Sequence, residues 1–265
     1  MSKCVGIIGV GNMGEALLAG LIQSGHPASQ ICITDKREDH AAALASQYGV
    51  TNQSVSAIAA ECEIILVVVK PQDLTSTLES LKPTLGPRAS ILSFVAGKTI
   101  AGIEAIVGGS HGVIRVMPNT PTLIGKGMSA ISPGTHTTQD DLGFARHFLG
   151  SSGKVVEVEE RLQDAVTATS GSGPAYFFAF VEAMIEGATK LGLSHEVATE
   201  LTVQTLIGAA GMLAESGKDA KTLRENVTSP NGTTAAALAS FQTADLGSIV
   251  HQAMQAAAKR SAELA

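Results

Sequence analysis

The segment GVGNMG, residues 9 to 14, restricts the fold more than any other part of this 265-residue chain. It follows the short apolar run CVGIIG and opens a stretch with apolar residues at helical spacing, which Gly25 closes. The glycine pattern G-x-G-x-x-G between a buried strand and a helix is typical of the first unit of a Rossmann-type sheet that binds a dinucleotide. A glycine-rich turn without a ligand is the alternative.

Each residue of this motif has an expected task. Gly9 permits the tight turn, Gly11 lets a pyrophosphate approach the backbone, and Gly14 lets helix and strand pack closely. Asn12 and Met13 lie at the start of the helix, where free backbone N–H groups face an anion. The motif therefore predicts the pyrophosphate site of a nicotinamide cofactor.

Strands and helices alternate over the first part of the chain. After the first unit, the expected strands are QICITD, EIILVVVK, ASILSFV and GVIRVM, with GMSAISP and GKVVEV as edge strands around the helix TQDDLGFARHFLG. Alternation in units of about thirty residues predicts an α/β fold with a doubly wound parallel sheet. We assign residues 1–158 to this dinucleotide-binding domain.

The strand signal ends at Glu159, and residues 159–265 read as an all-α domain for substrate binding and dimerisation. Pro174 suits a first helical turn, while Gly192 and Gly217 suit closing positions. Abundant alanine and glycine let helices approach closely, which favours intertwined subunits; packing within one bundle is the alternative.

The second strand ends in a mixed signal for cofactor choice. Asp35 lies where a carboxylate would bind a ribose diol and favour NADH, yet Lys36 and Arg37 could hold the additional phosphate of NADPH. Lys70 and Pro71 follow the next strand.

A later strand ends in MPNTP, whose two prolines stiffen the loop that carries Asn119. Because ligands lie beyond the carboxyl ends of parallel strands, this loop and the Lys70-Pro71 loop are candidates for the nicotinamide half of the cofactor. Ordinary proline turns are the alternative.

Composition excludes several other classes. A net charge of −6 without a basic run, and only 3% aromatic residues, argues against a nucleic-acid partner. The longest apolar runs, IILVVV and AYFFAFV, are too short to span a membrane, and the N-terminus lacks a secretory pattern, so we expect a cytoplasmic protein. Cys4, Cys32 and Cys62 show no C-x-x-C spacing, and His195 has no second histidine four residues on, so we expect reduced cysteines in the core and no metal.

The segment NVTSPNGTTAAAL interrupts the helical half. Its Pro-Asn-Gly turn ends one helix, and the next is expected to start at about Thr233. The first free N–H groups of that helix, with the hydroxyls of Ser229, Thr233 and Thr234, would bind an anion. A carboxylate fits better than a phosphate, because the nearest cation, Arg224, stands five residues before Ser229; a helix cap without a ligand is the alternative.

A second expected helix break, DAVTATSGSGPAYFF, is also rich in small hydroxyls and glycines. Together with GVGNMG, VKPQ, MPNTP and ENVTSPNGTT, in this order, it makes the chain resemble pyrroline-5-carboxylate reductase along its whole length. The resemblance implies reduction of the cyclic imine acid to L-proline by NADPH, with NADH as the other option. It also implies homodimers with intertwined C-terminal helices, often assembled further into decamers.

The same resemblance implies roles for single residues. Ser229, Gly232 and Thr234 would hold the substrate carboxylate, and Thr167 matches the threonine that would donate a hydrogen bond or a proton to the imine nitrogen. Asn226 and Asn119 would contact the cofactor, as would Lys70 and the glycine-rich turn. Asn231 departs from the family pattern, which has glycine there; asparagine tolerates the left-handed region, so the turn should survive.

Two other functions compete. A β-hydroxyacid dehydrogenase would present a catalytic lysine with an asparagine four residues later, but Lys190 is followed by Ser194 at that spacing. A regulator that binds the cofactor without chemistry would use both helix breaks as structural turns. Such a sensor would not oxidise the nicotinamide when it meets the imine acid.

Overall fold

The computed structural model describes residues 3–108 and 110–264. Contacts divide the chain into two compact units: the first joins the chain up to Ser172 with the segment from Ala256, and the second spans Gly173–Gln255. This division lies later than the one expected at residue 158. The segment that follows Glu159 groups with the sheet, because Gln163 is fully buried and donates a hydrogen bond to Ser132 Oγ at 2.8 Å.

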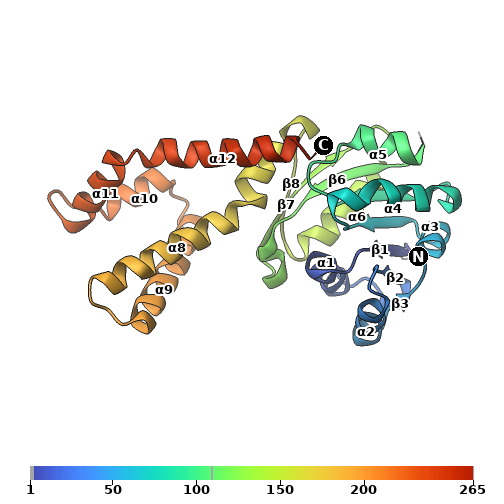
Figure 1. The fold of residues 1–265 in the computed structure, drawn as a ribbon, viewed down its shortest axis with the longest axis horizontal. Coiled ribbons are helices and arrows are strands. Elements are labelled where there is room, and N and C mark those ends of the chain that lie inside the picture. The colour runs from blue at the N-terminus through green and yellow to red at the C-terminus, as the bar shows by residue number, and fades with distance from the viewer. Residues whose placement is uncertain (1–2, 109, 265) are drawn as a thin grey trace. The chain divides into compact units, whose positions relative to one another are not determined.

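An eight-stranded sheet forms the centre of the first unit (Figure 1). Its strand order is β3-β2-β1-β4-β5-β6-β7-β8, parallel except for the antiparallel pair of β6 and β7. The strands are β1 (Val5–Ile8), β2 (Ile31–Thr34), β3 (Thr51–Asn52), β4 (Ile64–Val67), β5 (Ser90–Ser93), β6 (Val113–Met117), β7 (Gly127–Pro133) and β8 (Gly153–Glu157). The doubly wound sheet and both strands expected after β6 are confirmed, but only β8 lies at the edge, because β7 pairs with β6 and β8. The two-residue β3 was not anticipated.

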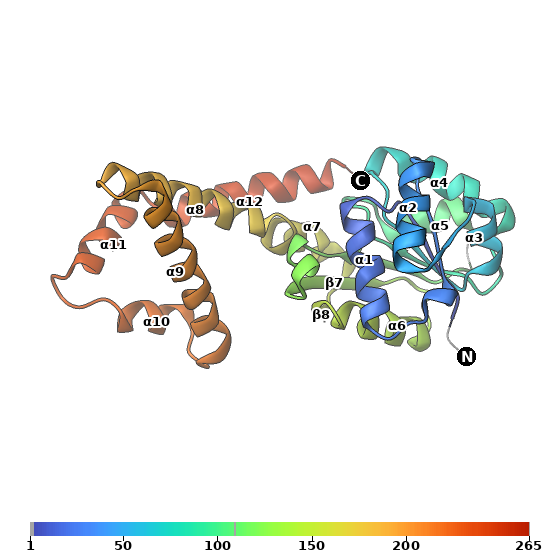
Figure 2. The same ribbon diagram turned by 90° about the horizontal axis from the view of Figure 1, so that it is seen from below.

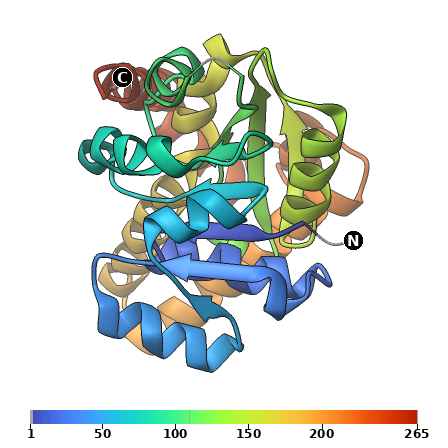
Figure 3. The same cartoon turned by 90° about the vertical axis from the view of Figure 1, so that its right-hand side faces the viewer.

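Helices cover both faces of this sheet, as the end-on view of Figure 3 shows. Apolar side chains of α1 (Asn12–Gln23), α2 (Glu38–Tyr48) and α6 (Gln139–Gly150) fill one face. Those of α3 (Val55–Glu61), α4 (Leu74–Leu81) and α5 (Ile100–Val107) fill the other. A fully buried residue such as Leu18 or Leu78 contributes about 1.5–3 kcal/mol, so the two layers hold the strand ends in place.

Short helical turns connect several strands and helices of the first unit. They are η1 (Ala28–Gln30), η2 (Pro71–Asp73), η3 (Lys82–Thr84), η4 (Thr120–Ile124) and η5 (Glu160–Leu162). After η5 the chain runs through α7 (Gln163–Val166) into the π-helical turn η6 (Thr167–Gly171).

The second unit is entirely helical. It contains α8 (Gly173–Lys190), α9 (His195–Glu215), α10 (Ala220–Asn226), α11 (Thr233–Thr243) and most of α12 (Leu246–Ala262), with α8 and α9 side by side in Figures 1 and 2. Ser194 begins α9 by accepting a hydrogen bond from the Val197 N–H. The rings of Phe180 and Phe241, 6.4 Å apart, join α8 to α11.

This second unit has almost no interior of its own. Between residues 173 and 255 the only buried side chains are those of Ala198 and Thr202. Large apolar side chains lie more than half exposed, among them Phe177, Phe178, Leu201, Ile207 and Ile249. Exposed apolar area on this scale marks an interaction surface.

Helix α9 is long and apolar enough to cross a bilayer by length and composition, and 11% of its most apolar window is buried. The sequence runs named above did not reveal it, because polar residues interrupt its apolar stretches. A single exposed helix of this kind is weak support for a membrane span. The same exposure is expected of a helix that packs against a second protein subunit.

Candidate active site

The glycine-rich turn after β1 has the geometry that its three glycines predict. Gly9 has a φ of +93°, and a Cβ there would lie 2.6 Å from the Val68 carbonyl oxygen. A Cβ at Gly14 would lie 2.0 Å from the Gly9 carbonyl oxygen, so this glycine lets α1 pack against the turn. A Cβ at Gly11 would meet nothing within 4 Å, which leaves open space beside the backbone for a ligand.

Helix α1 begins in this open space. Its N-cap residue, Gly11, has no side chain, and no side chain caps the first turn. The unpaired N–H groups at the start of a helix, with the positive end of its dipole, bind anions well. A pyrophosphate is therefore the ligand that this end of α1 fits.

A cleft of about 780 Å³ extends from the turn across the carboxyl ends of β1, β2 and β4. A cleft of this size accommodates a large organic ligand. Its lining includes Gly9, Gly11, Asp35, Lys36, Arg37 and Lys70, which are half of the cofactor contacts expected from the sequence. The cleft thus lies where a doubly wound sheet binds dinucleotides.

The other expected cofactor contacts lie outside this lining. Asn12, Met13 and Gly14 belong to the first turn of α1, where their backbone, more than their side chains, faces an anion. Pro71 begins η2, while Asn119 follows β6 and Asn226 ends α10 in the second unit. Cofactor contacts of these last two residues stay predictions.

Sequence reasoning missed one wall of the cleft. Five polar residues from η2 and α4 line it: Gln72, Asp73, Ser76, Thr77 and Ser80. The signal was present, because Leu74, Leu78 and Leu81 bury one face of α4 and turn the polar face outward. Only the pairing of β4 with β1 shows that this face lies beside the glycine-rich turn.

Asp35 and His40 clamp the glycine-rich turn from the β2 side. The Val10 N–H donates to Asp35 Oδ2 at 3.0 Å, and His40 Nε2 lies 2.8 Å from the Val10 carbonyl oxygen. Burial alone would raise the pKa of Asp35, but hydrogen bonds from the Arg37 N–H and side chain and from Val10 outweigh it and lower the pKa. Asp35 is therefore a carboxylate that helps to shape the turn.

Lys36 reaches across the cleft to Asp73, with 2.6 Å between Nζ and Oδ1. The lysine side chain is 74% exposed, so solvent screens the pair and it contributes little to stability. Its importance is chemical. Lys36 carries a mobile positive charge at the rim where β2 ends, and Asp73 competes with any anionic ligand for it.

The segment expected to be a second helix break contains a π-helical turn followed by a bend at Ser172, and α8 begins at Gly173, beside Pro174 as expected. The turn η6 directly continues α7, and the Ser172 N–H donates to the Thr167 carbonyl oxygen at 2.8 Å. The π-helical turn itself was not anticipated. Turns of this kind frequently mark functional sites.

Thr167 lies buried in this π-helical turn. Its hydroxyl donates to the carbonyl oxygen of Gln163 at 2.9 Å, so its one proton is already in use. The hydroxyl oxygen keeps lone pairs that accept a hydrogen bond. In the same turn, the Ser170 hydroxyl is buried and has no hydrogen-bond partner among the residues that the structure describes.

Asn119 fastens the MPNTP loop to the π-helical turn. Its Nδ2 donates to the Ser170 carbonyl oxygen at 3.2 Å, and its Oδ1 accepts from the Met128 N–H at 2.8 Å. A Cβ at Gly171 would lie 2.5 Å from Met117 Cε, so the turn passes close to the Met117 side chain at the end of β6. The MPNTP loop and the Thr167 segment therefore form one connected structure in the first unit.

Asp164 lies inside α7 and gives no helix-cap hydrogen bond. Its Oδ1 accepts from Ser261 Oγ at 2.7 Å and lies 3.6 Å from Arg115 Nη2. Arg115, 5% exposed in β6, also pairs with Glu160 at 3.5 Å. These charged groups connect α7 and the end of α12 to the sheet. Because Asp164 is paired, the segment that carries Thr167 has no unpaired carboxyl group that could act as an acid.

The TSPNGTT turn in the second unit has the backbone that its sequence predicts. Helix α11 begins at Thr233, and Asn231 adopts the left-handed conformation with φ of +58°, as expected. A Cβ at Gly232 would lie 2.5 Å from Ser229 Oγ, so a larger residue there would displace the serine hydroxyl. No side chain caps α11.

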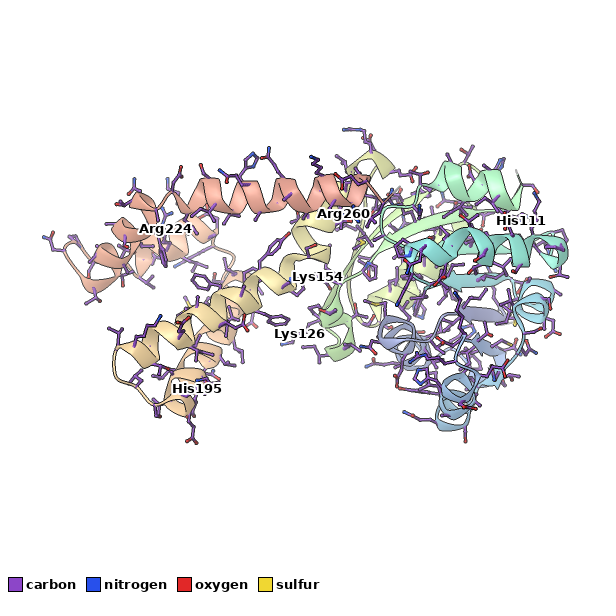
Figure 4. The ribbon with its side chains drawn as sticks, viewed as in Figure 1. His111, Lys126, Lys154, His195, Arg224 and Arg260 are labelled. Atoms are coloured by element: carbon purple, nitrogen blue, oxygen red, sulfur yellow. The ribbon has the colours of Figure 1, made fainter. Side chains whose placement is uncertain are left out.

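The hydroxyls of this turn are also free. Within the described part of the chain, no hydrogen bond engages the side chains of Ser229, Thr233 and Thr234, although Thr228 bonds to the Arg224 carbonyl oxygen at 2.6 Å. Figure 4 marks Arg224 on the preceding helix α10, with its side chain 56% exposed. Uncapped N–H groups beside three hydroxyls have the chemistry that suits a small anion.

Comparisons with known proteins agree with both halves of this description. The family described as pyrroline-5-carboxylate reductase dimerisation matches residues 160–264, and the family described as NADP oxidoreductase, coenzyme F420-dependent, matches residues 4–97. A pyrroline-5-carboxylate reductase of Pseudomonas aeruginosa is 40% identical over 263 residues, which cover 98% of this chain and 96% of the relative. The Arabidopsis thaliana enzyme of that name is 36% identical, covering 98% and 95%.

Solved structures extend the match to the fold. A pyrroline-5-carboxylate reductase from Coxiella burnetii superposes with a TM-score of 0.93 at 32% identity, covering 100% of this chain and 99% of the other. A Plasmodium falciparum pyrroline carboxylate reductase with NADP bound gives 0.89 at 29% identity, covering 99% and 98%. The chain belongs to the pyrroline-5-carboxylate reductase family.

Proposed function

We propose that this protein reduces L-1-pyrroline-5-carboxylate to L-proline, the last step of proline biosynthesis, with NADPH as the reductant and NADH as a second option. The observation that carries the substrate assignment is the uncapped start of α11 beside three free hydroxyls, because its size and charge suit one carboxylate. The open space at Gly11 and the cleft beside it support the cofactor assignment.

The turn before α11 would bind the substrate carboxylate through Ser229, Gly232, Thr233 and Thr234. Each charge-assisted hydrogen bond of this type contributes about 1.5–3 kcal/mol, so two or three bonds suffice for a small acid. A phosphate would need more positive charge than the turn offers. Fixing the carboxylate also fixes which face of the ring meets the reductant, and such positioning accounts for most of the acceleration.

Thr167 would orient the imine instead of acting as its acid. Because its hydroxyl proton is donated to Gln163, the oxygen is left to accept a hydrogen bond from a protonated imine N–H. A cyclic imine that enters protonated needs no strong acid, and the segment offers none. When bound, the reduced nicotinamide supplies the hydride to the carbon of the C=N bond.

The residues of the cleft fit the two halves of the cofactor. Gly9, Gly11, Asn12, Met13 and Gly14 would hold the pyrophosphate at the start of α1. At the adenosine end, Lys36 and Arg37 would hold the additional phosphate of NADPH, and Asp35 would lie near the ribose. Towards the nicotinamide we place Lys70 and Pro71, together with Asn119 and Asn226.

The family match to a dimerisation domain indicates a homo-oligomer. We propose that two chains pair through α8 to α12 and that dimers assemble further into decamers. The support is the unit from Gly173 to Gln255, whose apolar side chains find no core in a single chain. A second copy would cover α9 in place of a membrane, in a protein that acts in the cytoplasm.

One assay tests the function. Purified protein, the cyclic imine acid and NADPH are combined, and loss of nicotinamide absorbance is followed together with proline formed. We expect equal amounts of NADPH consumed and proline released. Binding of NADPH without oxidation would instead support the regulator, and light scattering of the same sample tests the oligomer, which a monomeric mass would refute.

A further inference from the structure

The three cysteines of this chain, the only ones it has, meet at one place. Cys4 precedes β1, Cys32 lies in β2, and Cys62 lies between α3 and β4. Their Sγ atoms all lie within 4.8 Å of one another, and those of Cys4 and Cys62 are 3.0 Å apart. Their positions in the sequence, far apart and without paired spacing, predicted only separate core residues.

The parallel sheet and a glycine bring the sulfurs together. Register pairs Gly6 of β1 with Cys32 of β2, and Cys4 lies two positions before Gly6 on the same face. A Cβ at Gly6 would lie 2.2 Å from Ile58 Cγ2 and 3.3 Å from Cys62 Sγ. The missing side chain therefore lets α3 close onto β1 and places Cys62 beside the other two.

This three-thiol group lies at the opposite strand ends from the cofactor cleft. Cys4, Cys32 and Cys62 are at the amino ends of β1, β2 and β4, whereas the glycine-rich turn and the cleft lie at the carboxyl ends. The proposed reductase chemistry does not use these thiols. Cys32 and Cys62 are buried, while Cys4 is partly exposed and gives a route from solvent.

We propose that the three-thiol group binds a soft, thiophilic d10 metal ion, Zn²⁺ or Cu⁺, through its three sulfurs. Thiolate ligands select such ions, and a metal–sulfur distance of about 2.3 Å places the sulfurs of a trigonal site about 4 Å apart. This spacing is inside the 4.8 Å limit of the group, and the Cys4 and Cys62 sulfurs would move apart from 3.0 Å to reach it. Each thiol that binds the ion releases its proton to water. For Zn²⁺, a water entering past Cys4 completes four ligands.

A metal accounts for the arrangement better than a disulfide does. A bond between Cys4 and Cys62 would leave Cys32 as an unused third thiol at the same point, and it would need an oxidant. A cation uses all three sulfurs and changes no oxidation state. It would also cross-link β1, β2 and α3, so binding should raise the temperature of unfolding.

The test uses the full-length reduced protein without air. One sample receives Zn²⁺ and another receives Cu⁺, each in competition with a colorimetric chelator, and the two arms distinguish the ions. We expect one ion retained per chain after desalting, a higher unfolding temperature, and loss of all thiols that react with a disulfide reagent. Because the chain has no other cysteine, the thiol count reports on this group alone.

Cys32→Ala and Cys62→Ala are the matched variants, and NADPH oxidation by each shows that it is folded. We expect each to lower the apparent metal affinity by at least about a hundredfold. If either fails to fold, Cys4→Ser at the partly exposed position replaces it. Equal retention by wild type and variants would overturn the proposal, as would three reactive thiols in the presence of both metals.

Discussion

Thr167 and Gln163 are joined by a hydrogen bond in which the threonine hydroxyl donates to the glutamine carbonyl oxygen at 2.9 Å. A hydroxyl has one proton to give, so a second partner must be a donor. The bond therefore bears directly on catalysis, since it favours a Thr167 that accepts from a protonated imine over one that protonates a neutral imine.

We predict that Thr167→Val reduces turnover of the imine acid by about ten- to a hundredfold, the value of one hydrogen bond to a charged group, and by the same factor at every pH. General acid catalysis is worth about a hundredfold to ten-thousandfold and would change the pH profile. Steady-state rates across pH separate these cases. Thr167→Ser, which keeps the hydroxyl, serves as the control; a loss in the valine variant that changes with pH, with activity retained in the serine variant, would restore the acid role.

Thr234→Ala should raise the KM for the imine acid by about tenfold and leave NADPH binding unchanged, because in the proposed site the lost hydroxyl would bind only the substrate carboxylate. Kinetics with varied substrate give the KM, and NADPH fluorescence gives the cofactor affinity. Thr243→Ala is the matched control on the same helix, since the Thr243 hydroxyl is bonded to the Ala239 carbonyl oxygen at 3.0 Å. Weakened NADPH binding with an unchanged KM would contradict the carboxylate site.

Local patterns predicted much of this fold. The roles of Gly9 and Gly14 could be predicted from the strand and helix that flank them in the sequence. The strands β1, β2 and β4 could be predicted from their apolar runs, because these runs are buried in the sheet. The turn at Asn231 was equally local, because the residue's own backbone tolerance and a following glycine decide it.

Features that form where segments distant in the sequence meet could not be predicted from local patterns. The polar wall of α4 joined the cleft only through the pairing of β4 with β1, and Cys4, Cys32 and Cys62 met only through three strands and a helix. The π-helical turn at Thr167 was missed for another reason. Small hydroxyl residues and glycines suit both a helix break and a π-helical turn, so their pattern alone does not distinguish the two.

Lys36→Met should lower kcat/KM for NADPH by about ten- to a hundredfold and change that for NADH little, because only the former carries the extra phosphate. Asp73→Asn should raise kcat/KM for NADPH by a few-fold, since it removes the carboxylate that pairs with Lys36 at 2.6 Å. Parallel assays with both cofactors measure the ratio. Lys82→Met, outside the cleft lining, is the charge-matched control, and an equal loss with both cofactors would remove Lys36 from the phosphate site.

Asp141 links stability to pH through the start of α6. Its carboxylate accepts from the Thr138 hydroxyl at 2.6 Å and from Lys3 Nζ at 3.1 Å, while the Asp141 N–H donates to Thr138 Oγ1 at 3.1 Å. Burial alone would raise the pKa of Asp141, but hydrogen bonds from Thr138, Ser90 and Lys3 outweigh it and lower the pKa below its ordinary value of 3.8. The charged form is thus favoured by the folded protein.

A lowered pKa in the folded state gives stability that is fully present above the unfolded pKa and is lost as pH falls through the folded pKa. We therefore predict that Asp141→Asn lowers the free energy of unfolding by about 1 kcal/mol at neutral pH, and that the difference from wild type shrinks below about pH 4. Urea unfolding at fixed protein concentration measures both. Asp140→Asn is the control, because Asp140 pairs with the same Lys3 at 2.7 Å but is 81% exposed, where solvent screens the pair. An equal effect of the two substitutions, or a difference that grows in acid, would show that the buried cap does not carry this stability.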